Sequence, residues 1–418
     1  MTQDVGVLVV GGGPAGLAAA VAARHAGCAA RVAVLERESE TGGIPRHTVH
    51  TGYGLREFRR LLDGPGYARR WSARAHAAGV ELHTRTTVTE WDAGARTVTT
   101  TAPDGIRTWR ARAIVLATGC RERPRSARLV PGTRPLGVLT TGALQQLALL
   151  PGAHVGRRAV VVGAEHVSFS AVLTLYHAGC AVTAVVTDQP HHQSYEALRA
   201  LAAGRHRVPL LTRAAVTRIL GRGRVDGVEL TDLVSGATRR VECDTVVFTG
   251  DWIPDHELAR RGGLVMDPGT RGPRVDLRLR TSAPGVFAAG NLVHAAETAG
   301  VCARGGAAAG SAAAAWVRGT PAAETPPTDV ECEPPLRWIS PNAVIPGETG
   351  TPQGHFLLRS DAWARRAEVT VAQGDAVLGA WTRRLVPNRP VHLPDGWLAR
   401  VEREGGPVRV SVSGTGDA

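Results

Sequence analysis

A glycine-rich turn near the amino terminus limits the possible folds more than any other feature of this sequence. The turn follows the apolar run Val5–Val10 and precedes the alanine-rich stretch Leu17–Gly27, which together predict strand, turn and helix. Its residues are Gly11, Gly12, Gly13, Pro14, Ala15 and Gly16. In a G-x-G-x-x-G turn the first glycine permits a tight bend, the second admits a pyrophosphate, and the third lets helix and strand pack closely. The turn therefore predicts a dinucleotide site, with the phosphates at the amino end of the helix.

An acidic residue stands at the position where such a site needs one. The β-branched run Arg31–Glu36 predicts a second strand, and Glu36 ends it about 20 residues after Gly16. A carboxylate there accepts hydrogen bonds from both hydroxyls of a ribose. Strand, turn, helix, strand and acid together are far more specific than a glycine motif alone.

The same order of elements appears a second time. Arg158–Val162, Gly163–Ser168, Phe169–Gly179 and Ala181–Val186 read as strand, turn, helix and strand. In both copies a hairpin and a further strand follow. The repeat is too long for a solenoid and suits a duplicated domain, so we predict an α/β chain with two nested Rossmann-like three-layer domains.

The last part of the chain has a different character. Prolines cluster between Pro321 and Pro335, and beyond them lie short alternating runs such as Glu368–Val371 and Val408–Val412. We expect one discontinuous nucleotide-binding domain over 1–127 and 254–322, a second over 128–253, a linker over 323–335, and a small β-rich domain over 336–418.

Composition excludes several classes of protein. The net charge is +12, but every basic residue is an arginine and the arginines are scattered, which argues against nucleic-acid binding. No apolar run is long enough to span a membrane and no leader precedes the first strand, so we expect a cytoplasmic protein. No two of the six cysteines are close in sequence, and His191, His192 and His206 have no accompanying ligand set, so we expect no metal site.

Two further segments carry a resemblance to a known family. Thr281–Gly290, with Gly285-Val286-Phe287-Ala288-Ala289-Gly290, is followed by Asn291, and Ala117-Thr118-Gly119 follows an apolar strand. With the first glycine turn, these segments resemble FAD-dependent oxidoreductases of the thioredoxin reductase and glutathione reductase superfamily, over about residues 5–320. The resemblance implies FAD, and it implies that Asn291 replaces an acid which binds the ribityl chain. An amide still forms such a hydrogen bond.

The resemblance also assigns cofactor contacts outside the glycine turn and Glu36. The expected positions are Arg37, Gly43, Arg46, Val88, Ala117, Thr118, Gly119, Gly290, Asn291 and Thr298. Disulfide reductases of this superfamily carry a C-x-x-C pair, and both places where it would stand lack cysteine here. The chain is therefore similar to the non-disulfide branch, which includes opine and octopine dehydrogenase, hydrogen cyanide synthase and the α chain of sarcosine oxidase. That likeness rests on Thr118–Pro124 and Gly290-Asn291, and it implies oxidation of small metabolites.

The second glycine turn departs from the pattern for NAD(P)H binding. Gly163 is present, but Glu165 stands in place of the second glycine and Ser168 in place of the third. A carboxylate adds bulk and negative charge where a phosphate must touch the backbone. Two interpretations remain open: a domain that binds NAD(P)H, and a scaffold that does not.

Few side chains are candidates for proton transfer. His47 and His50 follow Gly43 in a loop that such a fold places near the flavin, where a histidine can accept a proton as hydride leaves the substrate. The alternative is that these loop residues contact cofactor phosphate or solvent.

Three functions follow from these expectations. The first is a flavin dehydrogenase that takes hydride from an amine, imino acid or hydroxy acid. The second is an NAD(P)H-dependent flavin reductase. The third is a flavin-bearing electron-transfer subunit that docks on a second flavoprotein or another electron-transfer protein.

Overall fold

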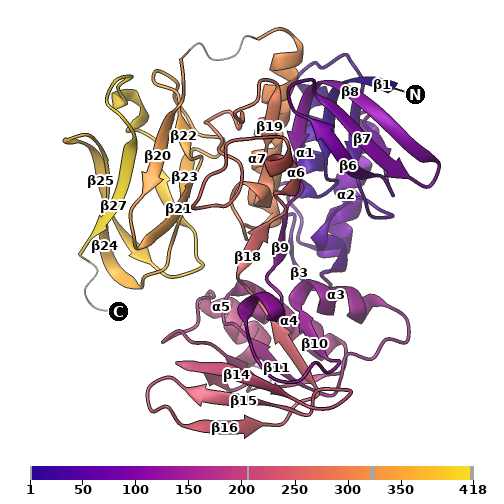
Figure 1. Cartoon of the computed structure of the whole chain (residues 1–418), viewed down its shortest axis with the longest axis vertical. Coiled ribbons are helices and arrows are strands. Elements are labelled where there is room, and N and C mark those ends of the chain that lie inside the picture. Colours follow the sequence, from indigo (N-terminus) through magenta and orange to yellow (C-terminus); the bar gives the residue numbers. More distant parts are fainter. Residues whose placement is uncertain (1, 205–206, 321–324, 415–418) are drawn as a thin grey trace.

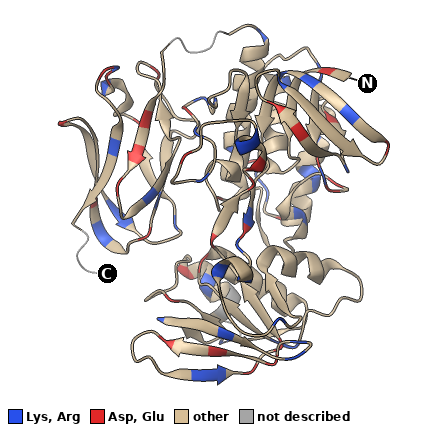
Figure 2. Cartoon of the chain, viewed as in Figure 1, with Lys and Arg blue, Asp and Glu red and all other residues tan. Residues whose placement is uncertain are grey.

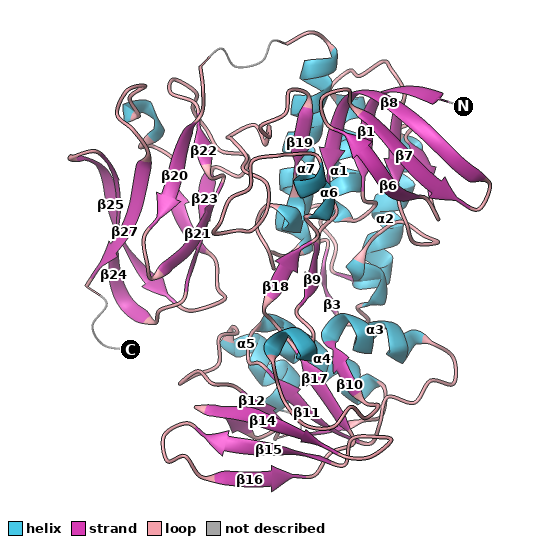
Figure 3. Ribbon diagram, viewed as in Figure 1, coloured by secondary structure: helices cyan, strands magenta, loops and turns pink. Residues whose placement is uncertain are grey.

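The computed structural model describes residues 2–204, 207–320 and 325–414. The chain forms three parts, two built from helices and parallel strands and one built almost entirely from strands (Figures 1 and 3). The predicted fold class is therefore confirmed. The expected boundary at 322/323 and His206 lie outside the described residues, and the expected domain limits stay predictions.

The first part contains the amino-terminal glycine turn. Its sheet has the order β5-β2-β1-β8-β7-β6, and β19 also pairs with β8. The strands are β1 (Thr2–Val10), β2 (Val32–Leu35), β5 (Glu81–His83), β6 (Thr87–Asp92), β7 (Thr97–Ala102), β8 (Gly105–Leu116) and β19 (Val286–Ala288). Helices α1 (Pro14–His25), α2 (Gly64–Ala77) and α7 (Ala299–Val317) belong to this part.

The pairing pattern explains the strand composition. β1 is paired in parallel with β2 on one side and β8 on the other, so its apolar residues are buried. Sequence alone predicts one hairpin strand over Leu82–Trp91. The structure instead divides that stretch between β5, which pairs in parallel with β2, and β6, which pairs antiparallel with β7.

The second part repeats the parallel core. Its sheet has the order β10-β17-β11-β12-β13, and all its pairs are parallel. The strands are β10 (Val138–Thr140), β11 (Arg158–Val162), β12 (Ala181–Val186), β13 (Leu210–Leu211) and β17 (Thr245–Phe248), with helices α3 (Thr141–Leu149) and α4 (His166–His177). An antiparallel layer consists of β14 (Ala214–Leu220), β15 (Gly227–Asp232) and β16 (Thr238–Val241).

Two short strands join these parts. β9 (Cys120–Glu122) leads from the first part into the second, and β18 (Trp252–Pro254) leads back, the two pairing antiparallel. Figure 1 shows this ribbon between the upper and lower parts. The second fold is therefore inserted into the first, as the sequence repeat predicts.

The carboxyl-terminal part is a pair of sheets around its own apolar core. One sheet has the order β22-β20-β27-β24-β25 and the other β21-β23-β26. The strands are β20 (Thr328–Cys332), β21 (Leu336–Ser340), β22 (Ala343–Val344), β23 (His355–Ser360), β24 (Ala364–Gln373), β25 (Ala376–Leu385), β26 (Val391–Pro394) and β27 (Val408–Ser413). Charged residues are spread over all three parts (Figure 2), which fits the absence of a basic stripe in the sequence.

Candidate functional site

The three motif glycines of the first turn have three different surroundings. Gly11 has φ +107°, a conformation that favours glycine, and a Cβ on Gly16 would overlap the carbonyl of Gly11. A Cβ on Gly13 would have only the Cα of Gly43, at 3.9 Å, within contact range. No side chain caps the amino end of α1 at Gly13. The turn therefore leaves open space and free N–H groups where an anion is expected.

Glu36 is fixed beside this turn. Its Oε2 accepts a hydrogen bond from the backbone N–H of Gly12 and its Oε1 accepts one from Glu38, both at 2.9 Å. The side chain is buried. Each carboxylate oxygen keeps a further lone pair, so the group fits the two hydroxyls of a ribose.

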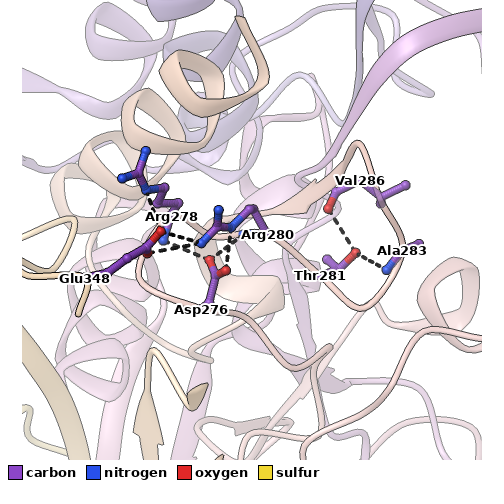
Figure 4. Close-up of polar contacts among 7 residues, drawn as sticks. All are labelled: Asp276, Arg278, Arg280, Thr281, Ala283, Val286 and Glu348. Carbon is purple, nitrogen blue, oxygen red and sulfur yellow. Dashed lines mark hydrogen bonds and ion pairs between the residues drawn. The ribbon is translucent and has the colours of Figure 1, made fainter. Parts of the chain in front are cut away.

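The distant element Thr281–Asn291 reaches the same turn. Thr281 donates its hydroxyl proton to the carbonyl of Val286 and accepts from the N–H of Ala283, which closes the bend before β19 (Figure 4). β19 pairs with the carboxyl end of β8, so the next residues emerge beside α1. A Cβ on Gly290 would lie only 2.6 Å from the Cβ of Ala15. The two segments expected to hold one cofactor are therefore neighbours.

Asn291 uses its amide to hold the loop that follows it. Its Oδ1 accepts from the N–H of Glu297 at 2.9 Å and from the thiol of Cys302 at 3.3 Å. Its Nδ2 donates to the carbonyl of Glu297 at 3.2 Å, which a carboxylate could not do. The second Nδ2 hydrogen remains available, so the expected bond to a ribityl hydroxyl stays a prediction.

Helix α7 packs closely against α1 because two glycines at the contact have no side chain. A Cβ on Gly306 would overlap the carbonyl of Ala15, and one on Gly310 would overlap that of Ala19. The hydroxyl of Thr298 accepts from the N–H of Val301 and caps the amino end of α7. This close packing fixes the amino end of α7 next to Asn291.

Arg46 carries the clearest unsatisfied group near the turn. The backbone N–H of Gly42 donates to the carbonyl of Gly12, which places the short helix Ile44–His47 beside the glycine turn. The Nε of Arg46 is buried, and the described residues give it no partner. Glu38 and Glu40 lie 3.9 Å from its terminal nitrogens. A largely buried guanidinium whose Nε has no partner fits a cofactor phosphate. The space at Gly13, Glu36 and Arg46 thus fits FAD.

The two candidate histidines lie in different places. His47 adjoins Arg46, and burial together with the Arg46 charge lowers the pKa of His47, which favours neutral imidazole. His50 bonds through Nε2 to the hydroxyl of Ser170 on α4 at 2.7 Å and through Nδ1 to the carbonyl of Thr51 at 2.8 Å. His47 therefore lies near the turn, whereas His50 joins the two nucleotide-type folds.

The remaining expected positions occupy the edges of this site. A Cβ on Gly11 would overlap the carbonyl of Ala117, so that strand end adjoins the turn. Thr118 donates to the carbonyl of Asp255 at 2.7 Å, and Gly119 has φ +77°. Arg37 is exposed, and Val88 packs partly buried at the edge of the core.

The second turn is filled by its own carboxyl group. Glu165 is buried, and a Cβ on Gly163 would lie 2.8 Å from its Oε2 while one on Gly250 would lie 2.9 Å from its Oε1. The Ser168 hydroxyl accepts from the N–H of Glu165 at 3.2 Å and bonds the Thr249 hydroxyl at 2.6 Å. Burial raises the pKa of Glu165, opposed by hydrogen bonds from Thr249 and Ser168. The amino end of α4 is thus occupied by the chain itself.

The carboxyl-terminal part covers the segment beyond β12. Trp363 donates its Nε1 hydrogen to the side chain of Gln189 at 2.9 Å. Arg389 donates to the carbonyls of Gln193 and Ser194, and its guanidinium lies 4.9 Å from the ring centre of Tyr195. Sequence reasoning missed these contacts because no local signal marks isolated residues as interface partners.

The same part also contacts the amino end of α7. Arg359 on β23 pairs with Glu297 at 2.5 Å, and both side chains are buried. Arg280 binds Asp276 and Glu348, which ties the segment before β19 to the carboxyl-terminal part (Figure 4). His294 is buried nearby, and desolvation lowers its pKa to about 4, with a further contribution from the charge of Arg359.

Three further properties concern thiols, metals and membranes. All six cysteines are free thiols. No group of three metal-ligating side chains occurs among the described residues. In the same residues, no helix has the length and apolar character needed to cross a membrane.

Comparison with known proteins gives consistent matches. The profile of the pyridine nucleotide-disulphide oxidoreductase family matches residues 5–310. The alpha chain of sarcosine oxidase from Corynebacterium sp. (strain P-1) is 32% identical, covering 62% of this chain and 28% of its own length. An opine oxidase subunit from Agrobacterium tumefaciens (strain Ach5) is 34% identical over 41% of this chain and 35% of its own length.

A solved structure supports the fold. Thioredoxin reductase of T. acidophilum is 23% identical, with a TM-score of 0.62, covering 75% of this chain and 98% of that one. The chain spans only 28% and 35% of the two curated relatives named above.

Proposed function

Since the chain belongs to the pyridine nucleotide-disulphide oxidoreductase family and is an FAD-dependent oxidoreductase, we propose that its flavin accepts hydride from a small amine, imino acid or hydroxy acid. The family and its thioredoxin reductase-like neighbours use FAD and NAD(P)H. The question for this chain is therefore which donor reduces its flavin.

The position of Glu165 carries the proposal. Its carboxyl fills the turn at the amino end of α4, where a dinucleotide phosphate would need the same N–H groups. Trp363 and Arg389 cover the segment that follows β12, on the side expected for the adenosine half. Both obstacles oppose NAD(P)H and favour a metabolite as electron donor.

The cysteine thiols also support oxidation of a metabolite rather than disulfide reduction. Dithiol exchange needs two sulfurs within bonding reach, and the sequence has no C-x-x-C pair. Burial raises the pKa of Cys120 to about 12 and that of Cys302 well above its usual range, so both favour the unreactive protonated form.

Each residue of the site has a role in this proposal. Gly13 and the amino end of α1 receive the pyrophosphate together with Arg46, and Glu36 receives the ribose. Asn291 donates to the ribityl chain. The amino end of α7 provides N–H groups and a partial positive charge that stabilise negative charge on the flavin.

Bound FAD supplies the hydride acceptor. His47, kept neutral by burial and Arg46, is the group that accepts a substrate proton; its Nε2 contacts Nη2 of Arg46 at 3.5 Å, so Nδ1 is the nitrogen assigned to that proton. His50 serves as a positioning residue, because its two nitrogens bond Ser170 and Thr51.

A second candidate is a flavin-bearing subunit of a larger dehydrogenase. The relatives named for sarcosine and opines are subunits by name, and this chain covers only part of their lengths. The subunit names of these relatives support assembly with a second redox protein, either alongside metabolite oxidation or in place of it.

Anaerobic incubation with a metabolite panel tests the proposal. The purified flavoprotein is mixed with secondary amines, imino acids and hydroxy acids, and the visible absorbance of the flavin is followed. Bleaching by one class supports the dehydrogenase. Failure of all three classes, together with copurification of another flavoprotein, supports the electron-transfer subunit.

A further inference from the structure

An exposed loop lies beside the amino end of α7, close to Asn291, and its two faces differ. The loop Gly54–Leu61 joins β3 (Thr51–Tyr53) to β4 (Leu62–Asp63). The ring of Phe58 points inward and packs edge-on against Tyr67 and Trp71, with ring centres 5.7 and 5.4 Å apart. The N–H of Phe58 donates to the carbonyl of Gly54 at 2.9 Å. These contacts anchor the loop and fix which residues face outward.

The inner face of this loop reaches α7. A Cβ on Gly300, in the first turn of α7, would overlap Oε1 of Glu57. Asn291 bonds Glu297 and Cys302 in the same region. The loop therefore lies against the helix end that meets the flavin-binding element.

The outer face combines apolar and cationic side chains. Leu55 is 65% exposed and Leu61 is 63% exposed, although a leucine contributes most to stability when buried. Arg56, Arg59 and Arg60 are also exposed. Within the described part of the chain, none of these three guanidinium groups has an ion-pair or hydrogen-bond partner.

Neighbouring elements add little negative charge. Burial lowers the pKa of Arg304 on α7, and the charge of Arg56 lowers it further. His355 and His392, on β23 and β26 with ring centres 4.2 Å apart, have pKa values lowered by burial and by Arg304 and Arg56. The acids that act on these groups are Glu57 on Arg304 and Asp395 on His355. The surface around Arg56 is therefore short of negative charge.

We propose that the outer face of the Gly54–Leu61 loop docks an electron-carrier protein whose contact surface is acidic around an apolar centre. The three unpaired arginines favour a partner with negative charge. The two exposed leucines favour a partner whose apolar surface is large enough to cover them, and a small anion has no such surface. The proposal rests on the proposed function, because the partner removes the electrons that the metabolite delivers.

The electron count in this step is balanced. Flavin that has accepted a hydride returns to the oxidised state by giving two electrons to the redox centre of the carrier and one proton to solvent. A carrier with a two-electron centre takes both electrons, whereas two molecules of a one-electron carrier are needed, and each takes one. The loop contributes only the docking surface and reacts with neither partner.

Stopped-flow reoxidation tests the docking surface. The holoprotein is photoreduced anaerobically without any metabolite and mixed with flavodoxin, an acidic carrier, or with cytochrome c, a basic one. The test variant is R56E/R59E/R60E. The matched control is R218E/R222E/R239E, which changes the same charge at exposed arginines around β14–β16 of the second fold.

The proposal predicts that the rate of wild-type reoxidation by flavodoxin falls as salt is added, whereas the rate with cytochrome c does not fall. The test variant should react with flavodoxin about tenfold or more slowly, and the control should match the wild type. Flavin content and melting temperature establish that each variant is folded. The variant L55S/L61S keeps the charges, and its flavin should still be reoxidised by flavodoxin more slowly than that of the wild type at high salt.

Opposite results would overturn the docking surface. These are equal flavodoxin rates in the wild type and the test variant, or a wild-type flavodoxin rate that does not fall as salt is added. Because photoreduction replaces the metabolite, a failed metabolite screen leaves this result unaffected. Loss of docking and loss of the proposed dehydrogenase activity are therefore distinguishable.

Discussion

The carboxylate of Glu297, beside the amino end of α7, accepts a hydrogen bond at 2.5 Å from the guanidinium of Arg359, which belongs to the carboxyl-terminal β-rich part. Both side chains are almost fully buried. Removing one partner leaves a buried charge uncompensated. We expect Arg359→Met to destabilise the protein by about 3–5 kcal/mol in urea unfolding.

The matched control for this pair is Glu297→Gln/Arg359→Met, which removes both charges. It should recover most of the lost stability, because the desolvated carboxylate is gone as well. Equal losses in the single and double variants would show that packing of Arg359 on Trp338, rather than charge pairing, dominates.

Gly13→Glu should abolish FAD binding. A side chain there enters the open space above the turn and brings negative charge to the pyrophosphate position. The purified variant should be colourless, and added FAD should not restore the flavin spectrum. Gly396→Glu is the control. It places the same side chain on an exposed turn, where a Cβ would have no neighbouring atom within 4 Å. A yellow Gly13→Glu protein would refute the assigned phosphate position.

Glu165→Gly should strengthen NAD(P)H binding. The substitution removes a carboxyl that fills the turn, and glycine is tolerated at a helix N-cap. We expect the Kd for NADPH, measured by fluorescence titration, to fall about tenfold or more, equivalent to at least about 1.4 kcal/mol. Glu165→Gln separates bulk from charge and should bind nearly as weakly as the wild type. An unchanged Kd in the glycine variant would contradict this explanation.

His294 should make the fold sensitive to acid. Its pKa is lowered from 6.5 to about 4 because burial disfavours the imidazolium. An unfolded chain binds this proton below about pH 6.5 while the folded chain does not, so stability is full above that pH and is lost as pH falls toward 4. The loss from this group should be about 3 kcal/mol.

Urea unfolding at a series of pH values checks this prediction. His294→Asn should show a smaller decrease in stability between pH 6.5 and 4 than the wild type. His25→Asn, a change at an exposed histidine, should keep the wild-type pH dependence. Parallel curves for wild type and His294→Asn would exclude His294 as the source.

Local sequence predicted the parts of this protein that obey local rules. The glycine turn, Glu36 at a strand end and the repeated parallel core follow from spacing and apolar patterning. The approach of Gly290 to Ala15 was expected from the resemblance, although these residues are far apart in sequence.

Contacts between parts of the chain were beyond sequence reasoning. The sequence shows that Glu165 is bulkier than the glycine it replaces. Its burial, however, depends on Thr249 and Gly250, which follow a different strand, β17. The bond of His50 to Ser170 and that of Trp363 to Gln189 join separate parts. No period or motif marks such partners, because the fold alone brings them together.

Anaerobic mixing of the purified flavoprotein with NADH or NADPH tests the central claim most directly. Because the Glu165 carboxyl fills the turn at the amino end of α4, we expect the visible absorbance of the flavin to stay that of the oxidised form with either nucleotide in excess. Rapid and complete bleaching of the wild-type flavin by either nucleotide would contradict the claim that electrons come from another donor.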